Sequence, residues 1–459
     1  MNYISTRGKS EPVGFSEAVL MGLARDGGLL LPESYPDFGD RLTELAGLSY
    51  VDLAIEIFKP FVNNELTDEE LKQLVDNSYS SFASEEVTPL LFGKSHHLLE
   101  LYQGPTLAFK DVALQFLGNL FEILLKKTGK TLNILGATSG DTGSAAIYGV
   151  RGKENINIFM LHPKGKVSPI QERQMTTVLD DNVHNIAIHG NFDDGQRIVK
   201  EIFGDLNFRD EYALGAVNSI NWARIMAQIT YYFYAAFRLR EKSPELPLQF
   251  SVPTGNFGDI LAGYIAKQMG LPVNRLIIAT NENDILARVI ETGRYSLQDV
   301  HATLSPSMDI QISSNFERLL FDACGRDADK VNQLMDDLKS NGEFVLDDEP
   351  LTYIRKLFSA KRVDTEQTLN TIRSVYEQEG WIIDPHTAVG VAAAEEISAQ
   401  PVICLATADA AKFPAAVERA INTSPPQPKA LDGIFDKETR CLESEPSSDS
   451  VKSIIRQHV

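Results

Sequence analysis

Short hydrophobic runs alternate along most of this chain with longer segments in which apolar residues recur every three or four positions. The short runs predict β-strands, and the longer segments predict helices with one buried face. Strands that alternate with helices favour parallel sheets covered on both faces. The expected pairs are Thr131–Leu135 with Gly140–Tyr148, Ile156–Leu161 with Ser168–Leu179, Asn185–Ile188 with Asp193–Phe203, Gln249–Val252 with Asn256–Met269, Arg275–Ala279 with Asn283–Thr292, and Val402–Ala406 with Phe413–Ile421.

The same pattern divides the chain into four expected segments. Residues 1–85 carry helical patterns without candidate chemistry and predict an N-terminal accessory domain. Residues 86–240, which include a long helix over Asn218–Arg240, predict a small α/β domain, and residues 241–425 predict a larger one. The Ser- and Pro-containing residues 426–459 are expected to form a loosely attached tail.

Composition narrows the function classes. The 459 residues are 43% hydrophobic and 23% charged, with a formal net charge of −20, which opposes binding of nucleic acid or anionic membranes through the overall field. The chain has no apolar run of membrane-spanning length and no signal peptide, so we expect a soluble, cytoplasmic protein. Its cysteines, Cys324, Cys404 and Cys441, are too scattered to predict a disulfide framework or a metal site.

A first candidate site lies in the run Gln103–Asp111. Lys110 follows an apolar pair and opens an apolar helix, Val112–Leu125. The helix dipole and desolvation both disfavour a charged amine there, as a Schiff-base lysine requires. The alternative is an exposed lysine paired with Asp111. If this run is considered without the rest of the sequence, that alternative is favoured.

Two further turns follow predicted strands and are rich in glycine and hydroxyl groups. Thr138–Thr142 leads into a helix of small residues, so it presents amides and hydroxyls to an anion or simply allows close packing. Thr254–Gly258 could wrap a phosphate in the same way. Neither turn matches a dinucleotide fingerprint, and none of the Gly-Lys-Ser/Thr tripeptides completes a P-loop, which counts against a nucleotide-binding protein.

Together these runs resemble the threonine synthases, which are fold-type II pyridoxal-phosphate enzymes with a tryptophan synthase β-like fold. The resemblance covers nearly the whole chain and includes the N-terminal domain of the longer microbial and fungal type. The order of the motifs is more specific than any one of them. Further matching runs are Met160–Pro163 with Lys166–Gln174, Asn218–Arg224, and Ser305–Asp309 with Ser313–Arg318.

The resemblance implies a substrate, O-phospho-L-homoserine, and a role for each matched residue. Lys110 would bind pyridoxal phosphate covalently and then move protons, and Asp141 would lie near its 3-hydroxyl. Thr407 would meet the pyridine nitrogen. The cofactor phosphate would be held by Thr254, Gly255, Asn256, Phe257 and Gly258. The substrate carboxylate would be held by Thr138, Ser139, Gly140 and Thr142. Candidates for the leaving phosphate are Lys166, Ser168, Arg173, Asn218 and Arg224.

Several alternatives stay open. Asp409-Ala410 stands where the family usually has His-Pro, which puts proton transfer in doubt. Arg224 could instead form a salt bridge on the long helix. The resemblance implies that the turn containing His386 lies near the active site, but His386 could also be an ordinary helix-start residue. The nearest rival activity is a dehydratase or a phospho-lyase that stops before water adds to Cβ. A non-catalytic homologue would typically lack Lys110. No nucleic acid or membrane partner is expected, and monomer and homodimer are both possible.

Overall fold

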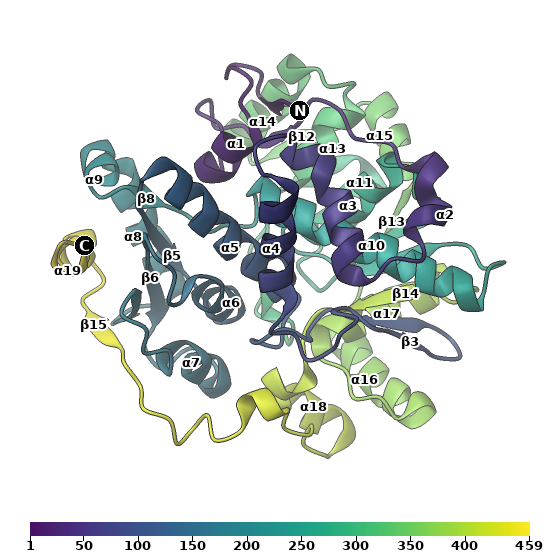
Figure 1. Cartoon of the computed structure of the whole chain (residues 1–459). Coiled ribbons are helices and arrows are strands. Elements are labelled where there is room, and N and C mark those ends of the chain that lie inside the picture. Colours follow the sequence, from purple (N-terminus) through teal and green to yellow (C-terminus); the bar gives the residue numbers. More distant parts are fainter. The chain divides into compact units, whose positions relative to one another are not determined.

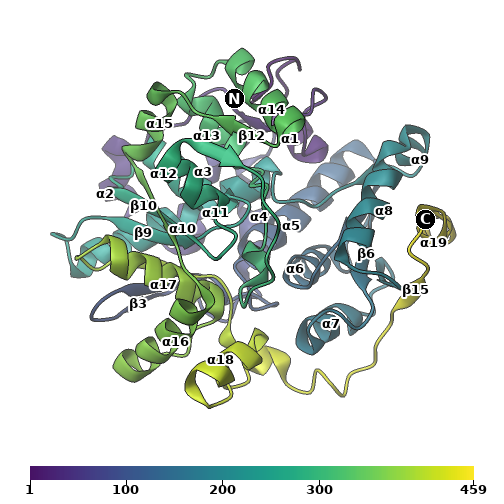
Figure 2. The same ribbon diagram turned by 180° about the vertical axis from the view of Figure 1, so that it is seen from behind.

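The predicted strand–helix pairs form two separate parallel sheets. The computed structural model describes all residues from Met1 to Val459 and contains two compact units. Unit 1 comprises Met1–Val75, Phe82–Gln103 and Ser219–Pro426, whereas unit 2 comprises Asp76–Ser81, Gly104–Asn218 and Gln427–Val459. Each unit is therefore assembled from stretches that are distant in the sequence, as the colours in Figures 1 and 2 show.

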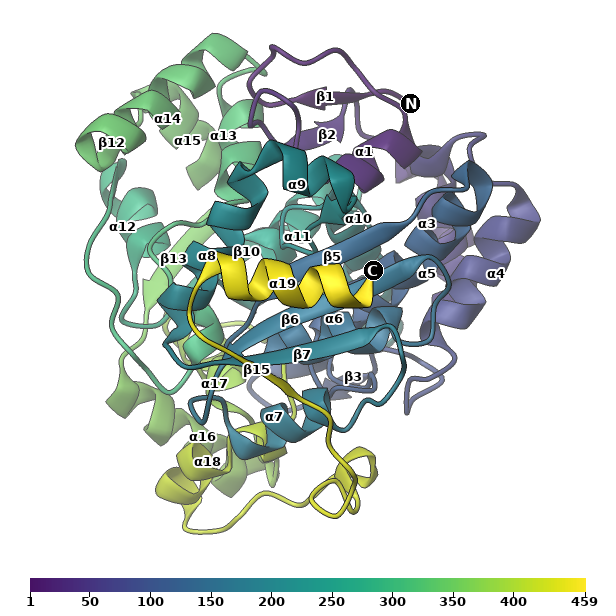
Figure 3. The same ribbon diagram turned by 90° about the vertical axis from the view of Figure 1, so that its left-hand side faces the viewer.

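Unit 2 contains a five-stranded sheet in the order β15-β7-β6-β5-β8, and all of its neighbouring strands are parallel. Its strands are β5 (Leu132–Ala137), β6 (Ile156–Pro163), β7 (Val183–Ile188), β8 (Leu214–Gly215) and β15 (Leu442–Ser444). Its helices are α5 (Lys110–Thr128), α6 (Asp141–Val150), α7 (Pro169–Thr176), α8 (Phe192–Gly204), α9 (Leu206–Glu211), η4 (Lys429–Leu431) and α19 (Ser448–His458). Helices α8 and α19 cover one face, and α6 covers the other (Figure 3).

The C-terminal segment is part of this sheet, so the expectation of a loosely attached tail is wrong. β15 pairs in parallel with β7, with Leu442 opposite Ile186. Val451 and Ile455 on α19 are fully buried in the same core cluster as Ile198 and Ile202 on α8. Apolar residues at helical spacing thus attach the chain end to the core. The polar residues around them in the sequence are of the kind found in linkers.

Unit 1 contains a six-stranded sheet in the order β13-β10-β9-β14-β4-β3, parallel except for the antiparallel edge strand β3. Its strands are β3 (Leu90–Phe92), β4 (His97–Glu100), β9 (Gln249–Pro253), β10 (Arg275–Thr280), β13 (Phe358–Arg362) and β14 (Ile403–Ala406). The larger helices packed in this unit are α10 (Trp222–Lys242), α11 (Gly258–Gln268), α12 (Ile285–Thr292), α16 (Thr365–Glu379), α17 (Pro385–Ile397) and α18 (Pro414–Ile421).

The N-terminal residues pack in unit 1 against α10. Trp222 at the start of α10 lies 5.8 Å from the ring of Tyr3 and 5.6 Å from that of Phe61. The remaining elements are β1 (Tyr3–Ser5), α1 (Phe15–Met21), β2 (Leu30–Pro32), η1 (Gly39–Arg41), α2 (Leu42–Leu45), α3 (Tyr50–Val62), α4 (Asp68–Tyr79), β11 (Arg294–Ser296), η2 (Pro306–Met308), α13 (Phe316–Ala323), α14 (Ala328–Asn341), β12 (Glu343–Val345), α15 (Asp348–Arg355) and η3 (Ala410–Lys412). None of the helices is both long and apolar enough to cross a membrane.

We expect Gly118→Ala to destabilise unit 2. A Cβ at Gly118 on α5 would lie 1.9 Å from the carbonyl oxygen of Gly149 on α6, so the two helices would have to separate. Overpacking of this kind costs about 1–3 kcal/mol, which thermal unfolding followed by circular dichroism would detect as a lower midpoint. Gly204→Ala, where nothing lies within 4 Å of the added Cβ, is the control. Equal midpoints for the two variants would contradict this packing.

Candidate active site

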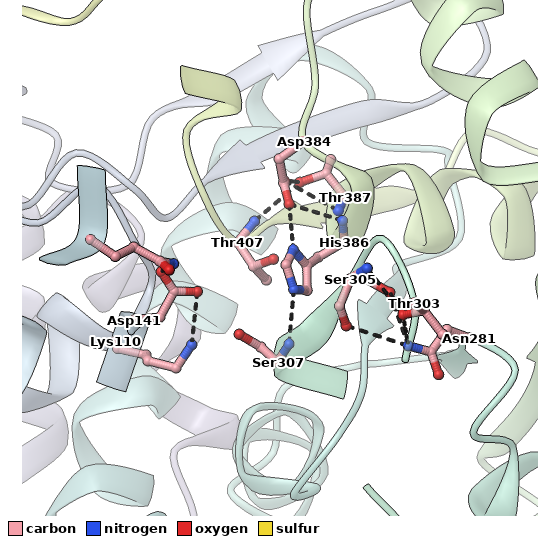
Figure 4. A network of polar contacts seen from close by, with 11 residues as sticks. Lys110, Asp141, Asn281, Thr303, Ser305, Ser307, Asp384, His386, Thr387 and Thr407 are labelled. Carbon is pink, nitrogen blue, oxygen red and sulfur yellow. Dashed lines mark hydrogen bonds and ion pairs between the residues drawn. The ribbon is translucent and has the colours of Figure 1, made fainter. Parts of the chain in front are cut away.

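Lys110 is the first residue of α5 and is buried, with 8% of its surface exposed. Its Nζ lies 3.6 Å from Oδ2 of Asp141 (Figure 4). The same Nζ lies 4.9 Å from the centre of the Phe109 ring. Asp111 is fully buried and accepts hydrogen bonds from the amide and the hydroxyl of Thr106, at 2.8 and 2.7 Å. The alternative of an exposed lysine is therefore wrong, and the acidic neighbour of Lys110 comes from another helix.

Asp141 is held in place by a turn that only glycine fits. Gly140 has φ +143°, and a Cβ on it would lie 2.2 Å from Oε1 of Gln171. Nε2 of Gln171 donates to Oδ1 of Asp141 at 2.7 Å, which leaves Oδ2 facing Lys110. Gln171 lies on α7, inside the Lys166–Gln174 run, but its residue type alone did not identify it as a site residue.

The Thr138–Thr142 turn carries unpaired donors. The Thr138 hydroxyl oxygen accepts from the amides of Gly140 and Gly143, so its first task is to shape the turn. The amide and the hydroxyl of Ser139 have no partner within the chain, and the same is true of Thr142. Because these donors lie at the N-terminus of α6, the turn is suited to a carboxylate.

In unit 1, the loop Thr254–Gly258 joins β9 to α11, and its amides are unpaired except that of Thr254, which donates to the Ala279 carbonyl at 2.8 Å. Its carbonyls are occupied: the Ser313 hydroxyl donates to Gly255 O at 2.7 Å, and the Asn315 amide donates to Asn256 O at 3.1 Å. The amides of residues 255–258 donate to no group of the chain, and Phe257 has the left-handed φ of +64°. Consecutive unpaired amides at a helix start fit a phosphate dianion.

Thr407 lies at the carboxyl end of β14, beside the strand that leads into this loop. β14 pairs in parallel with β9, and Cys404 lies opposite Ser251. Thr407 is buried, and its amide donates to the Thr387 hydroxyl oxygen at 3.3 Å. Two neighbouring parallel strands therefore bring a hydroxyl and a loop of unpaired amides to the same edge of the sheet, where α/β folds bind their ligands.

Arg224 is the most unusual candidate for the substrate phosphate. It lies on α10 with 4% of its surface exposed, and its Nε and Nη1 have no hydrogen-bond partner. Burial lowers the pKa of the guanidinium to about 10, so it stays charged at neutral pH. The alternative of a salt bridge on the long helix is wrong, because the structure contains no carboxylate paired with Arg224. A buried cation without a counterion is costly unless a ligand supplies one.

The other phosphate candidates, all in unit 2, have different surroundings. Lys166 is exposed, whereas Ser168 caps α7 and donates to Oε1 of Gln171 at 3.0 Å. Arg173 donates to the carbonyl of Lys437 at 3.3 Å and lies 5.9 Å from the centre of the Phe435 ring, so it also holds the C-terminal segment. Asn218 is half-buried at the end of a stretch of unit 2.

Comparisons with known proteins agree with this arrangement. Family models described as "Threonine synthase N terminus", "Pyridoxal-phosphate dependent enzyme" and "Threonine synthase, C-terminal" match residues 2–79, 86–408 and 387–455. The threonine synthase of Pseudomonas aeruginosa is 49% identical, over 100% of this chain and 98% of that protein. The fold is similar to that of threonine synthase with bound pyridoxal phosphate from Brucella melitensis, with a TM-score of 0.97 and 48% identity over 100% and 99% of the two chains. Threonine synthase from yeast has a TM-score of 0.96 and 45% identity, over 100% of this chain and 98% of that chain.

We expect Gly255→Val to weaken retention of pyridoxal phosphate by about tenfold or more, because overpacking beside the loop would displace its amides. A Cβ at Gly255 would lie 2.9 Å from the Ser307 carbonyl oxygen, which is backbone and cannot easily move. Gly258→Ala is the matched control, since the nearest atoms to its added Cβ lie at 3.4 Å, an ordinary contact. Absorbance of the cofactor retained after dialysis measures the effect. Unchanged retention in Gly255→Val would place the phosphate elsewhere.

Proposed function

This chain belongs to the threonine synthase family of pyridoxal-phosphate-dependent lyases, and on that premise we propose how its residues convert O-phospho-L-homoserine and water to L-threonine and phosphate. This reaction is the last step of threonine biosynthesis, and we place it in the cytoplasm. The observation that carries the proposal is that the guanidinium of Arg224 is buried and that its Nε and Nη1 have no partner. The protein also buries Lys110 at the start of a helix.

The residues present fit the cofactor. Lys110 would bind it covalently, the amides of Gly255 to Gly258 with Thr254 would hold its phosphate, and Thr407 would contact its ring nitrogen. Asp141 would lie near its 3-hydroxyl. When bound, pyridoxal phosphate withdraws electrons from the substrate and so allows protons to leave Cα and Cβ. A neutral hydroxyl at the ring nitrogen makes this withdrawal weaker than a carboxylate would.

Lys110 would carry the protons of the reaction. Its amine would exchange protons at Cα, Cβ and Cγ as phosphate leaves and water adds to Cβ. Asp141, 3.6 Å from Nζ, would orient the amine and stabilise it when it is protonated. Gln171 would keep that carboxylate facing Lys110 through its hydrogen bond of 2.7 Å. The surroundings of Nζ are buried, so exchange with bulk water would be slow.

The substrate needs two separate anion sites. We assign its carboxylate to the turn Thr138–Thr142, where unpaired amides and hydroxyls lie at the start of α6. We assign its phosphate to Arg224, with Asn218, Lys166, Ser168 and Arg173 as further donors. A dehydratase that acts on unphosphorylated serine or threonine would have no use for a buried, unpartnered guanidinium, so Arg224 favours phosphohomoserine over that rival.

The covalent attachment predicts a chemical label. Borohydride reduction of the purified holoenzyme, followed by peptide mapping, should place the reduced cofactor on the peptide that contains Lys110. Lys412 is also buried and serves as the internal comparison. If burial alone made a lysine react with the cofactor, both lysines would be labelled. A label on any other lysine would remove Lys110 from this role.

Arg224→Met should separate activity from stability. Charge-assisted contacts to phosphate contribute roughly 1.5–3 kcal/mol each, so kcat/KM for O-phospho-L-homoserine should fall by about one to two powers of ten. The melting temperature of the substrate-free enzyme should stay equal or rise, because an uncompensated buried charge has been removed.

Arg209→Met is the control, since the Arg209 side chain is 40% exposed and paired with Asp210. The assay follows both threonine and 2-oxobutyrate. Normal turnover of phosphohomoserine by Arg224→Met, or a preference of the wild type for serine, would favour the dehydratase.

A further inference from the structure

Asp384 caps α17 and is completely buried, with both of its carboxylate oxygens hydrogen-bonded (Figure 4). Oδ1 accepts from the amide of His386 at 2.9 Å and lies 2.7 Å from Nδ1 of its ring. Oδ2 accepts from the hydroxyl and the amide of Thr387. One carboxylate therefore orients two neighbouring side chains that point in different directions.

The first side chain contacts the wall of the phosphate loop. The Ser307 amide donates to Nε2 of His386 at 3.3 Å. The carbonyl of the same Ser307 lies so close to Gly255 that a Cβ there would approach it to 2.9 Å. Since Nε2 accepts a hydrogen bond, the proton of the neutral ring lies on Nδ1 and is donated to Asp384.

The second side chain contacts the other end of the cofactor site. The Thr387 hydroxyl donates to Asp384 and accepts from the amide of Thr407 at 3.3 Å. Thr407 is the residue that we assign to the ring nitrogen of pyridoxal phosphate. Asp384 thus connects, through one intermediate side chain on each side, the residue at the ring nitrogen with the wall of the phosphate cradle.

We propose that the Asp384–His386 pair positions both ends of the cofactor site, and that a proton added to Nε2 of His386 releases Ser307 and weakens cofactor binding. The proton would convert the acceptor into a donor that faces another donor, while Nδ1–H stays on Asp384. This inference rests on the proposed function, because it assumes that Thr254–Gly258 and Thr407 hold pyridoxal phosphate. His386 is a positioning residue and need not contact the substrate.

Asp384 interacts electrostatically with Asp409 and Tyr102, and Glu100 acts on both of these groups. The ring of Phe413 packs edge-on against His386, with centroids 4.8 Å apart. Burial, with a smaller contribution from the negative charge of Asp384, raises the pKa of the Asp409 carboxyl, and the buried Lys412 opposes that rise. Burial also holds the pKa of the Tyr102 hydroxyl well above its usual value, so Tyr102 stays neutral. His386 is thus the one histidine among these groups. Its Nε2 accepts from the Ser307 amide, and this is the contact that a proton on Nε2 would break.

Two substitutions separate the functions of the ring nitrogens. In His386→Gln the side-chain carbonyl can reach the position of Nε2 and accept from Ser307, but it does not titrate. In His386→Asn the amide can reach the position of Nδ1 and donate to Asp384, but Ser307 loses its acceptor. His189→Gln is the control, because His189 is exposed and paired with Glu443.

The measurement is the dissociation constant of pyridoxal phosphate, obtained by diluting each holoenzyme at about pH 8 and about pH 5.5, either side of the range in which histidines titrate. At the higher pH, His386→Asn should bind about tenfold more weakly than wild type, as expected for a lost hydrogen bond to a buried group, and His386→Gln within about threefold. The loss of affinity from high to low pH should be smaller in His386→Gln than in wild type and in His189→Gln.

Each outcome is decisive. Equal affinity and equal pH dependence in all four proteins would overturn the proposal. If His386→Asn does not fold, the comparison of wild type with His386→Gln still tests the proposal. A pH dependence of cofactor binding that is the same in these two proteins would also overturn the proposal. A wild-type protein that binds no pyridoxal phosphate would instead contradict the proposed function, so the two failures are distinguishable.

Discussion

Backbone amides without an acceptor are the constraint on which both candidate anion sites depend. A parallel strand that passes directly into a helix leaves the first amides of that helix unpaired. Here the amides of Ser139 and Thr142 are unpaired after β5, and those of residues 255–258 are unpaired after β9. Unpaired amides at a helix start attract negative charge, so each turn is more stable when an anion is bound. The two sites are therefore consequences of the strand–helix connection itself.

Buried charge adds chemical selectivity to these sites. Lys110 has a carboxylate partner, Asp141, whose orientation is fixed by Gln171. Arg224 has none, although burial makes an unpaired cation unfavourable. The two surroundings suit different chemistry: an amine beside a carboxylate is suited to exchanging protons, whereas an unpaired buried guanidinium is suited to binding an anion. Such local instability is typical of a binding site that is completed by its ligand.

Much of this arrangement could be predicted from the sequence. The strand–turn–helix order around Gly140 and around Gly255 follows from local hydrophobic periodicity and from residues that favour turns, and both signals act over a few positions. Lys110 was identified by its place at a helix start and by resemblance. Adjacency in the sequence suggests Asp111 as its partner, but the carboxylate beside Lys110 in the structure is that of Asp141. Asp111 is instead committed to Thr106.

What the sequence by itself determined is which segments become parallel strands, and hence that glycine and hydroxyl groups collect at strand ends. Only the tertiary structure decided what each side chain meets. It gave Arg224 no counterion, used Arg173 to hold the C-terminal segment, and added β15 to a sheet more than two hundred residues earlier in the chain. It also connected Asp384 through His386 to Ser307, and through Thr387 to Thr407. Contacts of this kind depend on burial and on distance in space, which local periodicity does not encode.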